Sequence, residues 1–172
     1  CILFLFWSIT RLVRSLLKEE KENLSVTDVI IILGSGLVGA LAYTFSDTFW
    51  FSAVEGEVYA FSSFLTALVF WMILRWQDES DSVYGDRWII LIAYIIGLSI
   101  GVHLLNLLCI PAIVLVFYYQ KYHAISFKGV AAAIVISGLL IVFILFVYIP
   151  GIADMGGWFE LLFVNVFGLP FH

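Results

Sequence analysis

Three carboxylates, Asp47, Glu55 and Glu57, stand in one short stretch whose other residues are mostly apolar. In an extended stretch, residues i and i+2 face the same way, so Glu55 and Glu57 could grip a divalent cation, or one of them could act as a base. A structural interpretation competes with this one. Asp47 could cap a short helix, and the two glutamates could favour the N-terminus of the helix that follows. The spacing alone leaves both interpretations open.

A second polar pair, His103 and Asn106, lies inside a long uncharged run. At positions i and i+3 the two side chains share a face if the segment is helical. A lone histidine in such a run is usually a packing residue, whereas two polar side chains in one membrane cavity favour a functional site. We therefore take both as candidate binding residues. The candidate ligands for a divalent cation are Asp47, Glu55, Glu57 and His103.

Uncharged runs predict that membrane-spanning helices position these residues. The chain is 63% hydrophobic and 12% charged, whereas ordinary soluble domains carry about 25% charge. Four of the five runs reach or approach the roughly 20 residues that cross a bilayer core of about 30 Å. The runs are residues 1–10, 29–46, 58–74, 88–120 and 129–153. The composition thus predicts an integral membrane protein.

All eight Lys and Arg residues fall in connections that can share one side of the membrane. They are Arg11, Arg14, Lys18 and Lys21, then Arg75 and Arg87, then Lys121 and Lys128. By the positive-inside rule these connections are cytoplasmic, which places residues 47–57 on the outer side.

The run 88–120 must turn back within the membrane. Its 33 residues would span about 50 Å as one helix, and a single crossing would place Lys121 and Lys128 on the wrong side. We expect the turn at 103–106, before Pro111, which disfavours an uninterrupted helix. Irregular backbone at that depth needs surrounding protein or a water-filled cavity. This is why His103 and Asn106 are expected to line a cavity.

We therefore predict an all-α fold, a polytopic transmembrane helical bundle with about six helical passages and a broken hairpin at 88–120. The passages are about 1–15 (truncated), 28–46, 57–76, 87–102, 107–120 and 129–150. Residues 151–172 are too few to cross after a break at Gly156 and Gly157, so we expect an outer interfacial segment. Residues 1–172 read as a fragment of one transmembrane domain of a larger protein.

Other motifs and partners are disfavoured by this context. Gly34, Gly36 and Gly39 match the GxGxxG pattern, but a dinucleotide site needs alternating strands and helices with polar faces. Glycines in a transmembrane helix more often permit close packing, as Gly97 and Gly101 would too. The net charge of −5 and the lack of an outer basic patch argue against nucleic acid as a partner.

The same polar segments carry a family resemblance. Residues 46–60 (SDTFWFSAVEGEVYA) and 97–106 (GLSIGVHLLN) resemble the protein O-mannosyltransferase-like membrane family, within the GT-C class of glycosyltransferases. The resemblance implies an enzyme that moves a sugar, such as mannose, from a lipid-phosphate carrier to an extracytoplasmic acceptor, either a protein serine or threonine or a glycan. Residues 47–57 would form its second outer loop, and we add Trp50 and Tyr59 to the candidate substrate-binding residues.

The resemblance also implies that a key acidic residue lies in the first outer loop. That loop would precede Cys1, so the catalytic residue is unknown and the fragment alone is expected to be inactive. A donor phosphate needs its charge neutralised, yet these outer segments hold no Lys or Arg. Either a divalent cation supplies the charge or cationic residues come from other parts of the protein.

Two rival functions remain at this point. A membrane transporter with a polar cavity at His103 and Asn106 would also use broken helices, but it predicts ionisable groups near the midplane. A structural subunit would leave the acidic, aromatic loop without a purpose. The enzyme interpretation places the protein in a bacterial inner membrane, with its active face periplasmic and with membrane lipids, a lipid-linked sugar and an acceptor as partners.

Overall fold

The computed structural model describes residues 1–20, 24–55, 58–82, 84–122 and 124–170. These residues form helices and short connections, with no strand among them, which confirms the predicted all-α fold. The elements are α1 (Ile2–Glu20), α2 (Val26–Thr44), α3 (Asp47–Val54), α4 (Val58–Glu79), α5 (Asp86–Ile100), the 3₁₀ helix η1 (Leu104–Leu108), α6 (Cys109–Lys121), α7 (Phe127–Phe143), the π-helical η2 (Ile144–Tyr148) and α8 (Ile149–Phe167).

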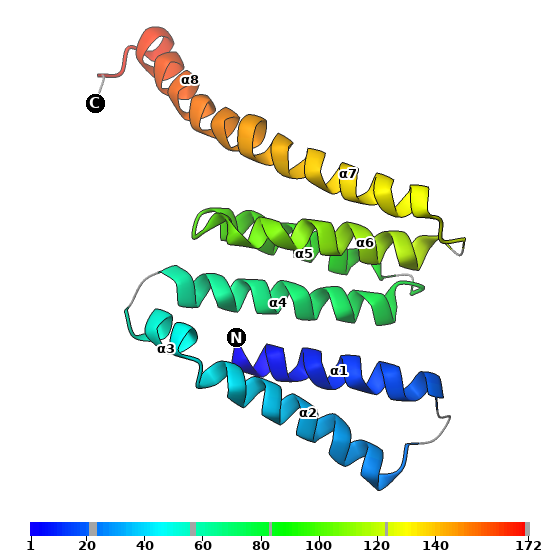
Figure 1. Ribbon diagram of the computed structural model, residues 1–172. Helices are drawn as coiled ribbons and strands as arrows, with labels where there is room; N and C mark the ends of the chain where they lie inside the picture. The colour runs from blue at the N-terminus through cyan, green and yellow to red at the C-terminus, as the bar shows by residue number, and fades with distance from the viewer. Residues whose placement is uncertain (21–23, 56–57, 83, 123, 171–172) are drawn as a thin grey trace.

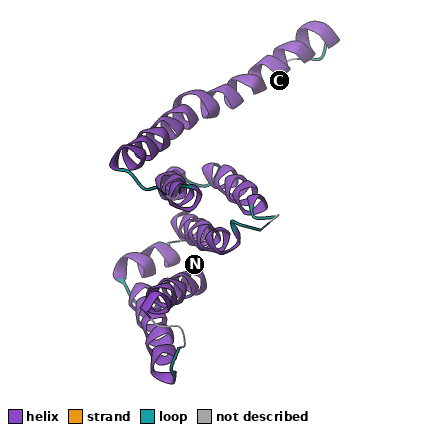
Figure 2. Cartoon of the chain, turned by 90° about the vertical axis from the view of Figure 1, so that its right-hand side faces the viewer, coloured by secondary structure: helices purple, strands orange, loops and turns teal. Residues whose placement is uncertain are grey.

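Four of the described helical stretches are long and apolar enough to cross a membrane. They are Val26–Thr44, Val58–Glu79, Leu104–Lys121 and Phe127–Phe167. Figure 1 shows the long helices running roughly antiparallel, with the α1–α2 pair at one edge, α4 in the middle and α7 beyond α5 and α6. Figure 2, turned by 90°, shows an open stack of helices from which the C-terminal helix extends. The chain is thus a helical membrane protein.

The core forms where α4 packs against α5, η1 and α6. Apolar side chains repeat along one face of α4, and Val69, Met72 and Ile73 are buried there. They contact a cluster that includes Ile92 of α5 and Ile110 of α6. The other side of α4 meets α1 through aromatic rings. Phe4 and Trp7 of α1 both contact Trp71, with ring centroids 5.4 and 5.9 Å apart.

The glycine motif packs α2 closely against α1. A methyl group on Gly36 would collide with Thr10, and one on Gly39 would lie 2.6 Å from Cδ1 of Ile9. These glycines therefore let two helix backbones approach, as the sequence predicts for small residues in a membrane. The same expectation is wrong for Gly97 and Gly101. Among the described atoms, a methyl group added to Gly97 would have none within 4 Å, and one added to Gly101 would meet only the backbone oxygen of nearby Leu98, at 3.5 Å.

The predicted break in the run 88–120 is confirmed. Helix α5 ends at Ile100, and the chain turns back through η1 into α6. His103 has an extended backbone (φ −164°, ψ 141°) and begins η1. Pro111 lies in the first turn of α6, where its missing N–H leaves no hydrogen bond unmade. The proline therefore marks the start of the returning helix.

The predicted break at Gly156 and Gly157 is wrong. Helix α8 runs through both glycines to Phe167, and α7, η2 and α8 form one helical stretch of 41 residues. A glycine costs a helix only about 1 kcal/mol, whereas each unpaired backbone group in lipid costs several. The chain bends at η2 instead, because the ring of Pro150 clashes with the carbonyl of Phe146 in an ordinary helix.

The long C-terminal helix is too long for one crossing. At 1.5 Å per residue its 41 residues extend about 60 Å, roughly twice a bilayer core. Only part of it can span the membrane. An interfacial position for residues 151–170 therefore stays a prediction.

Two further boundaries differ from the prediction. Helix α1 continues to Glu20 rather than ending near residue 15, because lysine and glutamate are good helix formers. Most of the outer connection 47–57 is also helical, as α3.

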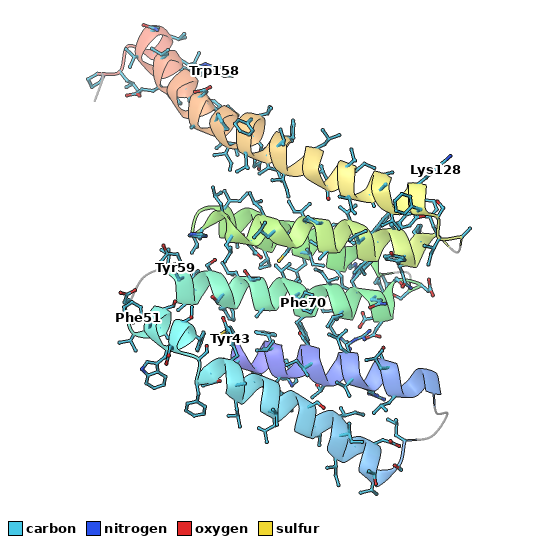
Figure 3. All side chains as sticks on the ribbon, viewed as in Figure 1. Tyr43, Phe51, Tyr59, Phe70, Lys128 and Trp158 are labelled. Atoms are coloured by element: carbon cyan, nitrogen blue, oxygen red, sulfur yellow. The ribbon has the colours of Figure 1, made fainter. Side chains whose placement is uncertain are left out.

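Basic residues gather at one end of the array. Arg75 lies near the end of α4, Arg87 at the start of α5, Lys121 at the end of α6 and Lys128 at the start of α7. Those termini point the same way in Figure 1, as does the C-terminus of α1, and Figure 3 labels Lys128 there. We call this the basic end. The opposite end, formed by α3, the first turn of α4 and the turn before η1, is the aromatic end.

Candidate functional site

Helix α3 builds the aromatic end from a sequence that was expected to be a loop. Ser46 has an extended backbone, and its hydroxyl accepts a hydrogen bond from the backbone N–H of Phe49. This cap starts the helix, so Ser46, rather than Asp47, is its capping residue. The ring of Phe49 packs on Tyr43 at the end of α2, with centroids 4.7 Å apart. Trp50 is exposed on the same short helix.

The carboxylates of α3 stand apart from each other. Asp47 is the first residue of the helix and Glu55 caps its C-terminus, which separates them by about 12 Å along the axis. Glu55 has a helical backbone (φ −65°, ψ −11°), so the extended geometry predicted for it is wrong. Glu57 lies outside the described residues. Both described carboxylates are exposed.

No group of three or more His, Cys, Asp or Glu side chains that could hold a metal occurs among the residues that the structure describes. Asp47 and Glu55 are too far apart to share one cation. A cation site at this end would need Glu57 together with one of them or with His103, and it stays a proposal.

His103 and Tyr59 join the two segments that carry the family resemblance. Their rings lie 5.4 Å apart between centroids, at an angle of 58°. The Nδ1 atom of His103 accepts a hydrogen bond of 3.0 Å from the backbone N–H of Leu105, which leaves Nε2 as the nitrogen free to face a ligand. Tyr59 is the second residue of α4, and Figure 3 shows it beside the α3 end of the array.

Asn106 lies deeper than His103 and points into the protein core. Its side chain is fully buried, and its Oδ1 accepts a hydrogen bond of 3.3 Å from the thiol of Cys109. Its Nδ2 has no hydrogen-bond partner among the described residues. Ser62 of α4 is also buried, and its hydroxyl has no hydrogen-bond partner in the described part of the chain. Burying an unpaired polar atom in a core costs free energy. Packing alone therefore does not explain the polar side chains in η1 and at the start of α4.

An apolar cavity of about 360 Å³ adjoins the aromatic end. It is lined from four elements by Cys1, Leu5, Ser8, Tyr43, Ser63, Thr66, Ala67, Phe70 and Leu105. Two of its lining residues also contact the residues described above. Tyr43 packs on Phe49 of α3, and the backbone N–H of Leu105 donates a hydrogen bond to Nδ1 of His103. The cavity reaches Phe70, which Figure 3 labels near the middle of α4.

Sequence reasoning found the polar pairs but missed this cavity. Of its lining residues, Ser63 and Thr66 could have been noticed, since they stand three apart on one face of α4. Tyr43 could not, because only the fold of α2 and α3 brings it to α4. The structure brings Tyr59 and His103 together. It leaves both His103 and Asn106, which were expected to line a cavity, outside the lining of this one.

The fold and these features define a class: a polytopic helical membrane protein with acidic and aromatic residues gathered at one end. Residues 1–126 match the family model of the Protein O-mannosyl-transferase TMEM260 N-terminal domain. The chain belongs to this family, which confirms the resemblance and indicates a glycosyltransferase-like function. Neither a curated protein nor a solved structure matches the chain.

Proposed function

We propose that the protein transfers mannose from a lipid-phosphate carrier to a serine or threonine hydroxyl of a protein on the extracytoplasmic side of the membrane. Family membership supports sugar transfer to protein. The observation that carries the proposal is the contact between Tyr59 and His103. It holds the two resembling segments at one end of the array, next to an apolar cavity.

Each part of the aromatic end suits one part of such a donor. The cavity is apolar and lies between membrane helices, which suits a hydrocarbon chain. Exposed aromatic side chains such as Trp50 and Tyr59 offer a flat apolar face with a polar tip for a sugar. Asp47, Glu55 and Glu57 supply carboxylates that take up a proton or hold a divalent cation at the donor phosphate.

The distribution of charge in four of the helices favours this function over transport. In α2, α4, α5 and α6 every charged residue lies within about five residues of a helix end. A transporter for a charged solute would carry ionisable groups near the membrane midplane. Within these four helices the middle turns are uncharged.

The test uses the full protein reconstituted with a polyprenyl-phosphate mannose donor and a peptide rich in serine and threonine. Glu57→Gln should lower the transfer rate by about 10²–10³, the usual cost of losing one positioned electrostatic contact. Glu55→Gln should cost less, because the Glu55 side chain is exposed at the end of α3. Asp81→Asn, in the turn between α4 and α5 at the basic end, is the matched control and should keep the normal rate.

One outcome would overturn the assignment of the site, and another would overturn the function. A normal rate in Glu57→Gln would reduce the acidic stretch to a helix-capping role. A full protein that transfers no sugar, yet moves a solute into proteoliposomes in a manner that depends on His103, would be a transporter.

A further inference from the structure

Three arginines surround one cavity at the basic end, far from the candidate site. The cavity has a volume of about 400 Å³ and lies between α1 and α4. Its walls are Arg11, Arg14, Ser15, Arg75, Asp78 and Glu79. All six side chains are polar, which distinguishes this cavity from the apolar one at the aromatic end.

Two of the arginines are already paired with the two carboxylates. Arg11 donates from Nε to Oδ2 of Asp78 at 2.7 Å and from Nη2 to Oδ1 of the same carboxylate. Arg75 donates from Nη2 to Oε1 of Glu79 at 2.8 Å. The other oxygen of Glu79 accepts a hydrogen bond of 2.8 Å from the indole N–H of Trp88. Both carboxylates are thus occupied.

Arg14 is the cation left over. It has no hydrogen bond or ion pair with any residue that the structure describes. The described lining residues supply three guanidinium groups and two carboxylates, which gives this part of the cavity a formal charge of +1. A planar guanidinium presents paired N–H donors that match two oxygens of a phosphate. The surplus charge and this donor geometry favour an anion with several oxygens.

The position of the cavity decides which anion reaches it. Arg75, Asp78 and Glu79 belong to the last five residues of α4, which is long and apolar enough to span the membrane. The end of such a helix lies at the level of the lipid headgroups. Basic pockets between transmembrane helices on the cytoplasmic side bind anionic headgroups.

We propose that this cavity binds the phosphate of an anionic membrane phospholipid. Arg14 is the principal contact, with Arg11 and Arg75 at its sides. The bound headgroup joins the end of α1 to the end of α4. This site is independent of sugar transfer, because it lies at the opposite end of the array from Tyr59 and His103.

The test titrates the full protein, in detergent micelles, with dioleoyl phosphatidic acid and follows the thermal unfolding temperature. Phosphatidic acid should raise this temperature, whereas phosphatidylcholine and inorganic phosphate at the same concentration should not. Arg14→Gln should weaken the apparent affinity about tenfold or more, as expected for one lost charge-assisted contact. Arg14→Lys keeps the positive charge but lacks the paired N–H donors of a guanidinium, so it should recover only part of the lost affinity.

Arg87→Gln is the matched control. It removes the same charge at the same end, but the Arg87 guanidinium lies 4.1 Å from the centroid of the Tyr84 ring and outside the cavity. The affinity of Arg87→Gln for phosphatidic acid should stay within about twofold of that of the unchanged protein. If Arg14→Gln and Arg87→Gln weaken the affinity for phosphatidic acid equally, the lipid is attracted only by the overall charge of this end, and the proposed site is wrong. Stabilisation by inorganic phosphate that is lost in Arg14→Gln would overturn the assignment to a lipid.

Discussion

The two ends of the helical array use their carboxylates in opposite ways. At the basic end, Asp78 and Glu79 are tied to arginines on α1 and α4. At the aromatic end, neither Asp47 nor Glu55 forms an ion pair or a side-chain hydrogen bond with a described residue. Paired charges hold helices in place, whereas unpaired ones stay available to a ligand. The difference separates a structural end from a candidate reactive end.

The aromatic end is held together by rings instead. Tyr43 packs on Phe49, and Tyr59 packs on His103. Ring contacts fix the positions of α3 and η1 without consuming charge. The end can therefore keep a definite shape while its carboxylates remain free.

The largest effect is expected from cysteine labelling, which tests whether the two ends lie on opposite sides of the membrane. Single cysteines are placed by Ser82→Cys, Ala124→Cys and Thr48→Cys, after Cys1 and Cys109 are replaced. A membrane-impermeant thiol reagent should label the first two from one side and the third only from the other, because the basic connections share a side. Labelling of Ser82→Cys and Ala124→Cys from different sides would refute the hairpin between α5 and α6.

A smaller effect is expected when the same Asp→Asn substitution is made at each end of the array. Asp78→Asn removes the partner of Arg11, whose side chain is only 19% exposed, and should lower the free energy of unfolding by about 1–2 kcal/mol. Asp47→Asn should lower it by no more than about 0.5–1 kcal/mol, because Asp47 contributes only charge at the start of a short helix. Denaturation of both variants in one detergent gives the comparison. Equal losses would remove the distinction between a structural end and a reactive end.

The smallest effect concerns Asn106, whose Nδ2 is buried without a partner among the described residues. Asn106→Leu replaces the amide by an apolar group of similar size and should leave stability unchanged or raise it by about 1 kcal/mol. If Asn106 serves the candidate site, sugar transfer by the full protein should fall at the same time. A stable variant with normal transfer would make Asn106 a core residue without a functional role.

Much of the fold was predictable because the membrane imposes strong rules. Uncharged runs predicted most of the helices to within a few residues, although they missed α3 and the continuation of the last helix to Phe167. The basic residues required a turn inside residues 88–120, which the structure has at His103. The error at Gly156 and Gly157 has a clear origin: glycine breaks helices in water, but lipid offers no alternative partners for the backbone.

The candidate site was predictable only in part. Spacing singled out His103 and Asn106 as one pair, yet their surroundings differ: His103 faces Tyr59, and Asn106 is enclosed in the core. The sequence also suggested that Glu55 is extended, whereas the cap at Ser46 makes the stretch helical. Local hydrogen bonds of this kind depend on a few atoms and leave little trace in composition.

The sequence by itself determined that this is an all-helical membrane protein of the O-mannosyl-transferase family, and it predicted that the basic residues share one side of the membrane. Those properties follow from hydrophobicity, charge and motif, which are fixed residue by residue. Only the tertiary structure decided which residues are in contact. Tyr59 meets His103 and Arg11 meets Asp78, whereas Arg14 has no described partner. Such contacts join residues more than forty positions apart, and they depend on how the helices stack and rotate against one another.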